Sequence, residues 1–133
     1  MRKYVLDQTD ARLRRFAYQL ARVGKQADAE AIHDLRVSIR RFSQCLRAFA
    51  QFFPGGKVKK IRRRLKGVMG LAADVRNQDI ALELILRARV PRGAALLNAV
   101  RRRRVQAERM LLGTARQWSQ RDISRKWRTQ LEL

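Results

Sequence analysis

Apolar residues recur along most of this chain at alternating steps of three and four, the spacing that places them on one face of an α-helix. The spacing is clearest between about residues 27 and 53. No window alternates apolar and polar residues with the period of two that a half-buried strand needs. The pattern therefore predicts an all-α protein, and its clearest seam consists of Ile32, Leu35, Ile39, Phe42, Leu46, Phe49 and Phe53.

The same spacing predicts further helices before and after this seam. A first helix is expected from about residue 6 to 23, a third from about residue 57 to 75, and a last long one from about residue 94 to 118. Residues 80–90 are rich in leucine and either continue the third helix or form a separate one. The inward-facing residues are predicted to be Leu6, Leu13, Phe16, Leu20, Val23, Val58, Ile61, Leu65, Val68, Ala72, Val75, Leu97, Val100, Ala107, Leu111 and Thr114.

Turn signals separate the expected helices. Pro54 precedes two glycines, Pro91 lies in the run Val90-Pro91-Arg92-Gly93, and a third break falls near Gly24. A short final helix containing Trp127 and Leu131 is expected to begin at Asp122 or Ser124. Four or five amphipathic helices with short connections form an antiparallel bundle. Residues 1–133 are therefore expected to make one helical domain.

The net charge of +21, from 32 basic and 11 acidic residues, narrows the functional classes. Such an excess repels itself in the compact state, and its usual uses are binding nucleic acid, an anionic membrane or another polyanion. Most of the basic residues are arginine, which is always charged and holds phosphate with a planar, bidentate fork. A surface that only confers solubility would be served as well by mixed lysine and glutamate. The composition therefore favours polyanion binding.

One face of the second expected helix concentrates these charges. His33, Arg36, Arg40 and Arg47 are separated by steps of three, four and seven, and Arg41 lies alongside. The acids of this helix all lie near its start, where they suit the helix dipole better than they neutralise the later arginines. The alternative is an ordinary solvated face with salt bridges, but the arrangement favours an anion-binding stripe.

Two later helices offer further basic candidates. The third expected helix carries a stripe that would share a surface with the second: Lys59, Arg62, Arg63 and Lys66. The last long helix contains four consecutive arginines, Arg101–Arg104. Because consecutive residues lie about 100° apart on a helix, these four cannot all face one way. Arg104 is the one we include as a candidate.

The residues that catalysis or metal binding would require are missing from the pattern. Cys45 is the one cysteine and His33 the one histidine, so neither a disulfide within the chain nor a multi-Cys metal site is expected. No phosphate-binding glycine loop, signal peptide or transmembrane segment is visible. The acids Asp74, Asp79 and Glu83 near Arg76 are interpreted as a structural ion-pair network. We therefore expect a cytoplasmic, non-enzymatic protein without cofactor or metal.

Residues 31–42, Ala-Ile-His-Asp-Leu-Arg-Val-Ser-Ile-Arg-Arg-Phe, closely resemble the opening signature of CHAD domains, the histidine-containing helical domains that bind inorganic polyphosphate. That signature is an apolar residue, His, two residues, Arg-Val, two residues and Arg-Arg. Residues 74–80 are similar to the family's second motif, Arg-Asp-x-Asp followed by an apolar residue, with Asn77 in place of the first acid. The last long helix, with its arginine run, is similar to the closing segment of the family.

The resemblance implies non-catalytic binding of inorganic polyphosphate in a basic groove, with polyphosphate granules as one candidate location. Residue by residue, the implied contacts are His33, Arg36, Arg40 and Arg41, with Lys66 and Arg76 by position.

Typical members of the family carry two tandem helical repeats related by a pseudo-twofold axis. This chain resembles one repeat, half of such a double bundle, over residues 27–133, behind an added N-terminal helix over residues 1–24. Two copies are therefore expected to pair as a homodimer with twofold symmetry.

Two other functions remain open at the level of sequence. A nucleic-acid-binding protein would use the same charge, with Trp118 and Trp127 stacking on bases. Most aromatic residues lie on the apolar seams, however, and no named nucleic-acid-binding module is visible. An enzyme acting on polyphosphate is the third alternative, and it lacks a visible nucleophile, base or metal cage.

If the charged form of His33 contacts phosphate, the affinity for polyphosphate is expected to rise as the pH falls, because a protonated imidazole is cationic. Titration calorimetry at a series of pH values measures this, with the His33→Gln variant as the control that lacks the titrating group. A flat affinity profile between about pH 5.5 and 8 in the unmodified protein would count against the contact.

Overall fold

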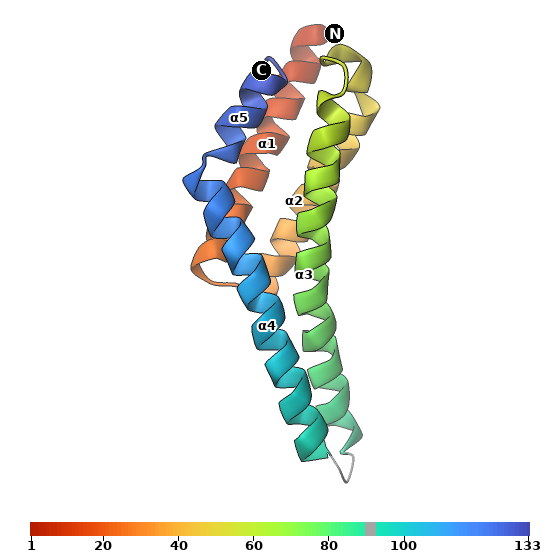
Figure 1. Ribbon diagram of the computed structural model, residues 1–133. Coiled ribbons are helices and arrows are strands. Elements are labelled where there is room, and N and C mark those ends of the chain that lie inside the picture. Colours follow the sequence, from red (N-terminus) through yellow and green to blue (C-terminus); the bar gives the residue numbers. More distant parts are fainter. Residues whose placement is uncertain (90–92) are drawn as a thin grey trace.

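The computed structural model describes residues 1–89 and 93–133, and helices account for most of both ranges (Figure 1). No strand occurs in these ranges, which confirms the prediction of an all-α protein. The elements are α1 (Arg2–Lys25), α2 (Ala29–Ala48), a short 3-10 helix η1 (Ala50–Phe52), α3 (Lys57–Ala88), α4 (Gly93–Gln120) and α5 (Ile123–Gln130).

The helices form an antiparallel bundle whose two hairpins, α1–α2 and α3–α4, lie side by side (Figure 1). α2 packs on α3 and α1 packs on α4, while α5 continues beyond α4 and packs against α1 near the end where both termini lie. The leucine-rich residues after Val75 continue α3 as far as Ala88, which settles the alternative that the sequence left open. The predicted turn at Val90–Gly93 falls largely outside the described residues.

A single hydrophobic cluster joins all five helices. At its centre, the Phe16 ring stacks on Trp127 with 5.7 Å between centroids and on Phe42 with 6.1 Å, and Trp118 meets Trp127 edge-on at 5.5 Å. The predicted seams supply most of this core. In α2, for example, the inner residues Ile32, Leu35, Ile39, Phe42 and Leu46 are all buried.

Local chemistry fixes the helix ends. The Asp28 side chain accepts a hydrogen bond of 2.8 Å from the Ala31 backbone N–H and so caps α2. Gly56 precedes α3 with φ of 80°, a left-handed conformation that glycine adopts without steric cost. Asp122 accepts a hydrogen bond from the Arg125 backbone N–H at 3.3 Å, so of the two predicted caps it is Asp122 that begins α5.

α1 is an integral part of the bundle, although the sequence suggested an added helix. Its inner face is fully buried and includes Leu13, Phe16 and Leu20. Two arginines of α4 bind the turn that joins α1 to α2: Arg116 donates to the Gly24 carbonyl at 3.1 Å, and Arg104 donates to the Ala27 carbonyl at 3.1 Å. The structure therefore gives no boundary between α1 and the rest of the chain.

Replacing Trp127 by alanine removes the largest buried side chain from the centre of the aromatic cluster. Loss of buried area together with the cavity that remains predicts a fall of about 3–5 kcal/mol in the free energy of unfolding. Chemical denaturation followed by circular dichroism measures it. The control is Tyr18→Ala, because Tyr18 is 62% exposed and its replacement is expected to cost under about 0.5 kcal/mol. Equal destabilisation by the two variants would contradict the assignment of Trp127 to the core.

Candidate anion-binding surface

The outer face of α2 carries the basic stripe that the sequence predicts. His33, Arg40, Arg41 and Arg47 are exposed, and Arg36 is partly buried. The spacing of the residues along α2 explains this arrangement. The inner residues of the helix pack on the core, and these five side chains lie on its outer side. Neighbouring helices then decide which further side chains join the stripe.

A pocket of ≈ 280 Å³ lies between α1 and α2. Four side chains that can carry positive charge line it, Arg12 and Arg15 from α1 and His33 and Arg41 from α2. The two α1 arginines were not predicted from the sequence. They are three residues apart and so share a helix face, but only the packing of α1 along α2 shows that this face borders the His33 stripe. The remaining lining residues are Asp34, Val37 and Ser38.

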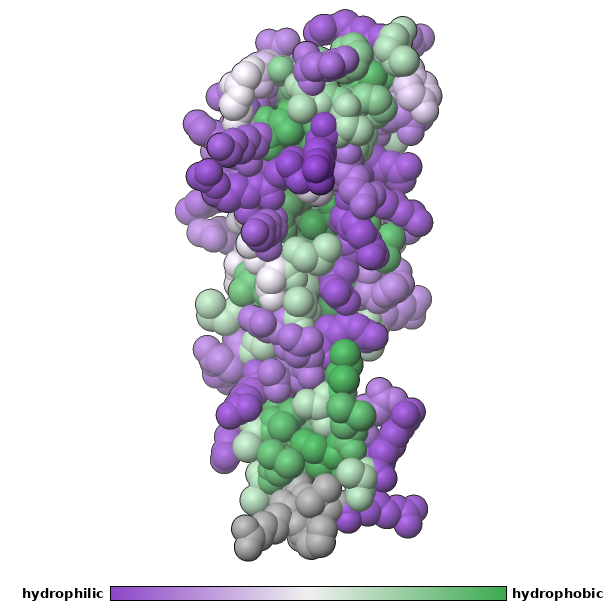
Figure 2. Space-filling model, turned by 90° about the vertical axis from the view of Figure 1, so that its right-hand side faces the viewer, coloured by the Kyte–Doolittle hydropathy of each residue, from purple (hydrophilic) through white to green (hydrophobic). Residues whose placement is uncertain are grey.

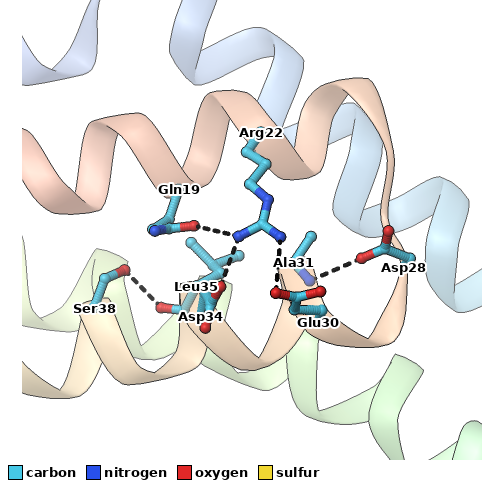
Figure 3. Close-up of polar contacts among 8 residues, drawn as sticks. All are labelled: Gln19, Arg22, Asp28, Glu30, Ala31, Asp34, Leu35 and Ser38. Atoms are coloured by element: carbon cyan, nitrogen blue, oxygen red, sulfur yellow. Dashed lines mark hydrogen bonds and ion pairs between the residues drawn. The ribbon is translucent and has the colours of Figure 1, made fainter.

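The one carboxylate in this pocket, Asp34, is held by an arginine of α1 (Figure 3). Arg22 Nη1 donates a hydrogen bond of 2.6 Å to Asp34 Oδ2, and its Nη2 lies 3.8 Å from Glu30 Oε1. The hydrogen bond to Asp34, more than the charge of Glu30, raises the pKa of Arg22 above its ordinary value. Because Arg22 balances the charge of Asp34, the other cationic groups of the pocket remain without a carboxylate partner among its lining residues.

On its other side, α2 borders α3 across a groove of ≈ 290 Å³. Arg40, Arg62 and Lys66 line it, which brings together three of the residues predicted from the sequence. Arg62 Nε donates a hydrogen bond of 3.2 Å to Ser43 Oγ, so its guanidinium is oriented across the groove. Lys59 and Arg63 are exposed on α3 but do not line this groove.

These openings are contiguous around α2. A third one, near the start of α1, shares Arg12 and Arg41 with the α1–α2 pocket and shares Gln44 with the α2–α3 groove. The shared residues define one path that runs from His33 past Arg41 and Gln44 to Lys66. We call this path the α2 basic path. Its lining includes six side chains that can carry positive charge: Arg12, Arg15, His33, Arg40, Arg41 and Lys66, with Arg62 as a seventh beside Lys66.

Arg36 has a buried donor without a partner. Among the described residues, its Nε is the one buried side-chain nitrogen or oxygen that makes no hydrogen bond. An unmet buried donor costs about 1–3 kcal/mol, and more when the group is charged. Arg36 lies one turn before Arg40 on the same side of α2.

Arg104, which the sequence offered as an anion-binding candidate, makes hydrogen bonds within the bundle. Its Nε donates to Asp79 Oδ1 at 2.9 Å, its Nη1 to Glu108 Oε2 at 2.8 Å and its Nη2 to the Ala27 carbonyl. Burial alone would lower the pKa of Arg104, but the hydrogen bonds and charges of Asp79 and Glu108 outweigh it and raise that pKa. Two of its nitrogens thus join α4 to α3 and to the α1–α2 turn, and the third pairs with Glu108 one turn further along α4.

The acids of the second motif also pair differently from the prediction. Asp79 binds Arg104, and Glu83 pairs with Arg87 one turn away at 2.6 Å, whereas the sequence suggested a network around Arg76. Arg76 and Asn77 are exposed on α3. A structural ion-pair network is therefore present, with Arg104 as its centre.

Several findings bear on the alternative functions. Trp118 and Trp127 are 7% and 1% exposed, so neither ring is available to stack on a base. Over residues 1–89 and 93–133, no group of three or more His, Cys, Asp or Glu side chains is placed to hold a metal ion. Within the same ranges, no helix is both long and apolar enough to cross a membrane.

Comparison with known proteins gives one match. The family model described as the CHAD domain matches residues 7–132, and this region begins inside α1. Neither the curated proteins nor the solved structures contain a match to the chain.

The Arg12→Gln/Arg15→Gln variant tests whether α1 takes part in anion binding. Removal of two charge-assisted interactions is expected to weaken binding of tripolyphosphate about tenfold or more, as measured by titration calorimetry. The matched control is Arg121→Gln/Lys126→Gln, which removes the same charge from exposed positions on the α4–α5 side of the bundle. An equal loss of affinity in both variants would show that Arg12 and Arg15 contribute only to the overall positive electrostatic field of the protein.

Proposed function

Because the chain belongs to the CHAD domain family, we propose that it binds inorganic polyphosphate, without catalysis, along the α2 basic path. The observation that carries this proposal is the continuity of that path. Three helices contribute cationic side chains to it, and His33 of the family signature lies at one end.

The chemistry of the path suits a polyphosphate chain. Such a chain carries roughly one negative charge per phosphate and has no bases, so recognition needs many cationic donors and no base-reading groups. Arginine supplies planar, bidentate donors at Arg12, Arg40 and Arg41, and lysine adds a point charge at Lys66. Arg36, partly buried one turn before Arg40, adds positive charge beside the same face.

The other predicted basic residues have a different part in this proposal. Arg47, Lys59, Arg63 and Arg76 are exposed around the path without lining it. They strengthen the positive field that steers a polyanion toward α2. Arg104 holds the helices together and makes no contact with the ligand.

We also propose a cytoplasmic protein that acts as a homodimer. The dimer is supported by the resemblance to one repeat of a two-repeat family. Polyphosphate granules are one location where such a protein would meet its ligand. Binding without turnover is itself testable, because incubation with long-chain polyphosphate and magnesium should release no phosphate.

Nucleic acid is the competing ligand, and competition distinguishes the two. We expect long-chain polyphosphate to displace a duplex DNA carrying the same number of charges, at about 150 mM salt, in a fluorescence anisotropy assay. DNA that resists displacement, or that displaces polyphosphate, would contradict the proposal.

The Arg40→Gln/Arg41→Gln variant localises the binding to the path. It should weaken polyphosphate binding at least tenfold, and it should lower the slope of log K against log salt by about 0.7–0.9 for each phosphate that is no longer neutralised. The Arg121→Gln/Lys126→Gln variant serves again as the charge-matched control and should keep most of the wild-type slope. Wild-type affinity and slope in the Arg40→Gln/Arg41→Gln variant would place binding elsewhere.

A further inference from the structure

The far ends of α3 and α4 extend beyond the other helices (Figure 1). Arg104, which binds both Asp79 and the Ala27 carbonyl, marks the level of the α1–α2 turn. The last buried residue of α3 is Val75, and the first of the described buried residues on α4 is Val100. Past Val75, α3 continues to Ala88, a distance of about 20 Å at 1.5 Å per residue. We call this projecting part, residues 76–88 and 95–103, the hairpin tip.

The hairpin tip is apolar and uncovered. Four of its large hydrophobic residues are exposed: Ile80 by 39%, Leu84 by 59%, Leu86 by 61% and Leu96 by 49%. Figure 2 shows a continuous hydrophobic area near this end of the molecule, whereas hydrophilic residues cover most of its middle. Ile80 and Leu84 are four residues apart and share one side of α3, while Leu86 points elsewhere. A helix that is apolar on more than one side is typical of a helix buried on more than one side.

The far end of the hairpin tip is also where the chain is least basic. Residues 77–88 contain Asp79, Glu83 and Arg87, a net charge of −1, and residues 93–100 carry no charge at all. In a chain of net charge +21, two copies repel each other over most of their surface. Over this far part, residues 77–88 and 95–100, a second copy can approach with few cations facing each other, whereas Arg76 and Arg101–Arg103 lie at the near end of the hairpin tip.

We infer that the hairpin tip is the surface on which a second copy of this chain docks. This inference rests on the homodimer of the proposed function and adds its location. A twofold contact sets each surface against its own copy, so it requires self-complementary charge. The far part of the hairpin tip meets that requirement because it carries almost no net charge, and its exposed acid Glu83 is paired with Arg87 on the same helix. In a twofold pair, the exposed apolar residues of the two copies meet there, and Arg101–Arg103 lie outside the centre of the contact.

The size of the hairpin tip determines how strongly two copies are expected to dimerise. A face about 20 Å long and two helix diameters wide, each about 10 Å, covers on the order of 400 Å² in each copy. Two such faces bury about 800 Å² in total, which is below the roughly 1,000 Å² of a stable specific contact, so a weak dimer in the micromolar range or above is expected.

Pairing at the hairpin tip has a consequence for ligand binding. α3 runs from the α2 basic path, where it contributes Arg62 and Lys66, past Arg76 to the hairpin tip. In a twofold pair, the two α3 helices meet at the hairpin tip. They therefore connect the α2 basic path of one copy to the α2 basic path of the other. A long polyphosphate chain can bind both copies at once, and its affinity rises because the second binding event is intramolecular and occurs at a high effective concentration. Tripolyphosphate binds one copy only.

Sedimentation equilibrium of the full chain without polyanion, over about 1–100 µM, tests the inference. The wild type is expected to dimerise, and Leu84→Glu is expected to weaken dimerisation at least tenfold because it places a carboxylate in the apolar centre. Leu96→Glu should act in the same way from α4. The matched control is Met110→Glu on α4, whose side chain is 54% exposed and lies outside the hairpin tip. Circular dichroism confirms that each variant is folded.

Each outcome is decisive. A wild type that stays monomeric at about 100 µM overturns the inference, and so does a dimer that Leu84→Glu and Met110→Glu weaken equally. A dimer that dissociates as salt is raised is held by charge contacts, which also overturns the inference, because an apolar contact between basic chains persists when salt screens their repulsion.

The same variants separate this inference from the proposed function. Leu84→Glu should bind tripolyphosphate as the wild type does and should lose the advantage of long chains. Failure of the wild type to bind tripolyphosphate along the α2 basic path would count against the proposed function and leave the dimer in place.

Discussion

The crowding of positive charge around α2 is the constraint on which the rest of the structure depends. Arg12, His33 and Arg41 border one pocket, and Arg40 and Lys66 border the adjoining groove. Side chains of like charge at this spacing repel one another, so the bundle must hold them in place. It does so through the aromatic core beneath α2, where four rings from α1, α2, α4 and α5 pack together. The cations are thus arranged before a ligand arrives, and binding needs little reordering of the helices.

The few acids of the chain hold helices together and leave most cations of the path without carboxylate partners. Asp34 joins α2 to α1 through Arg22, Asp79 joins α3 to α4 through Arg104, and Asp10 joins α1 to α5 through Arg128. Each ion pair crosses from one helix to another. This arrangement explains how a chain of net charge +21 can be both stably packed and strongly attractive to a polyanion.

The sequence predicted the helices well because the apolar spacing of each one depends on local periodicity. It predicted the His33 stripe for the same reason. It could not predict Arg12 and Arg15, since their role depends on which face of α1 lies along α2. It also could not predict the contacts of Arg104, because in a run of four arginines only the packing of α4 shows which one pairs with Asp79. The sequence left the length of α3 undecided. The far end of this helix lacks the alternation of buried and exposed residues that packing against neighbouring helices would impose.

The central claim is that the α2 basic path holds the polyphosphate chain. A crystal structure of the protein with tripolyphosphate tests it most directly. We predict phosphate groups in the pocket between α1 and α2, against Arg12, His33 and Arg41, and in the groove beside Arg40 and Lys66. Phosphate groups gathered instead on the exposed arginines Arg101–Arg103 of α4, with the α2 basic path empty, would contradict it.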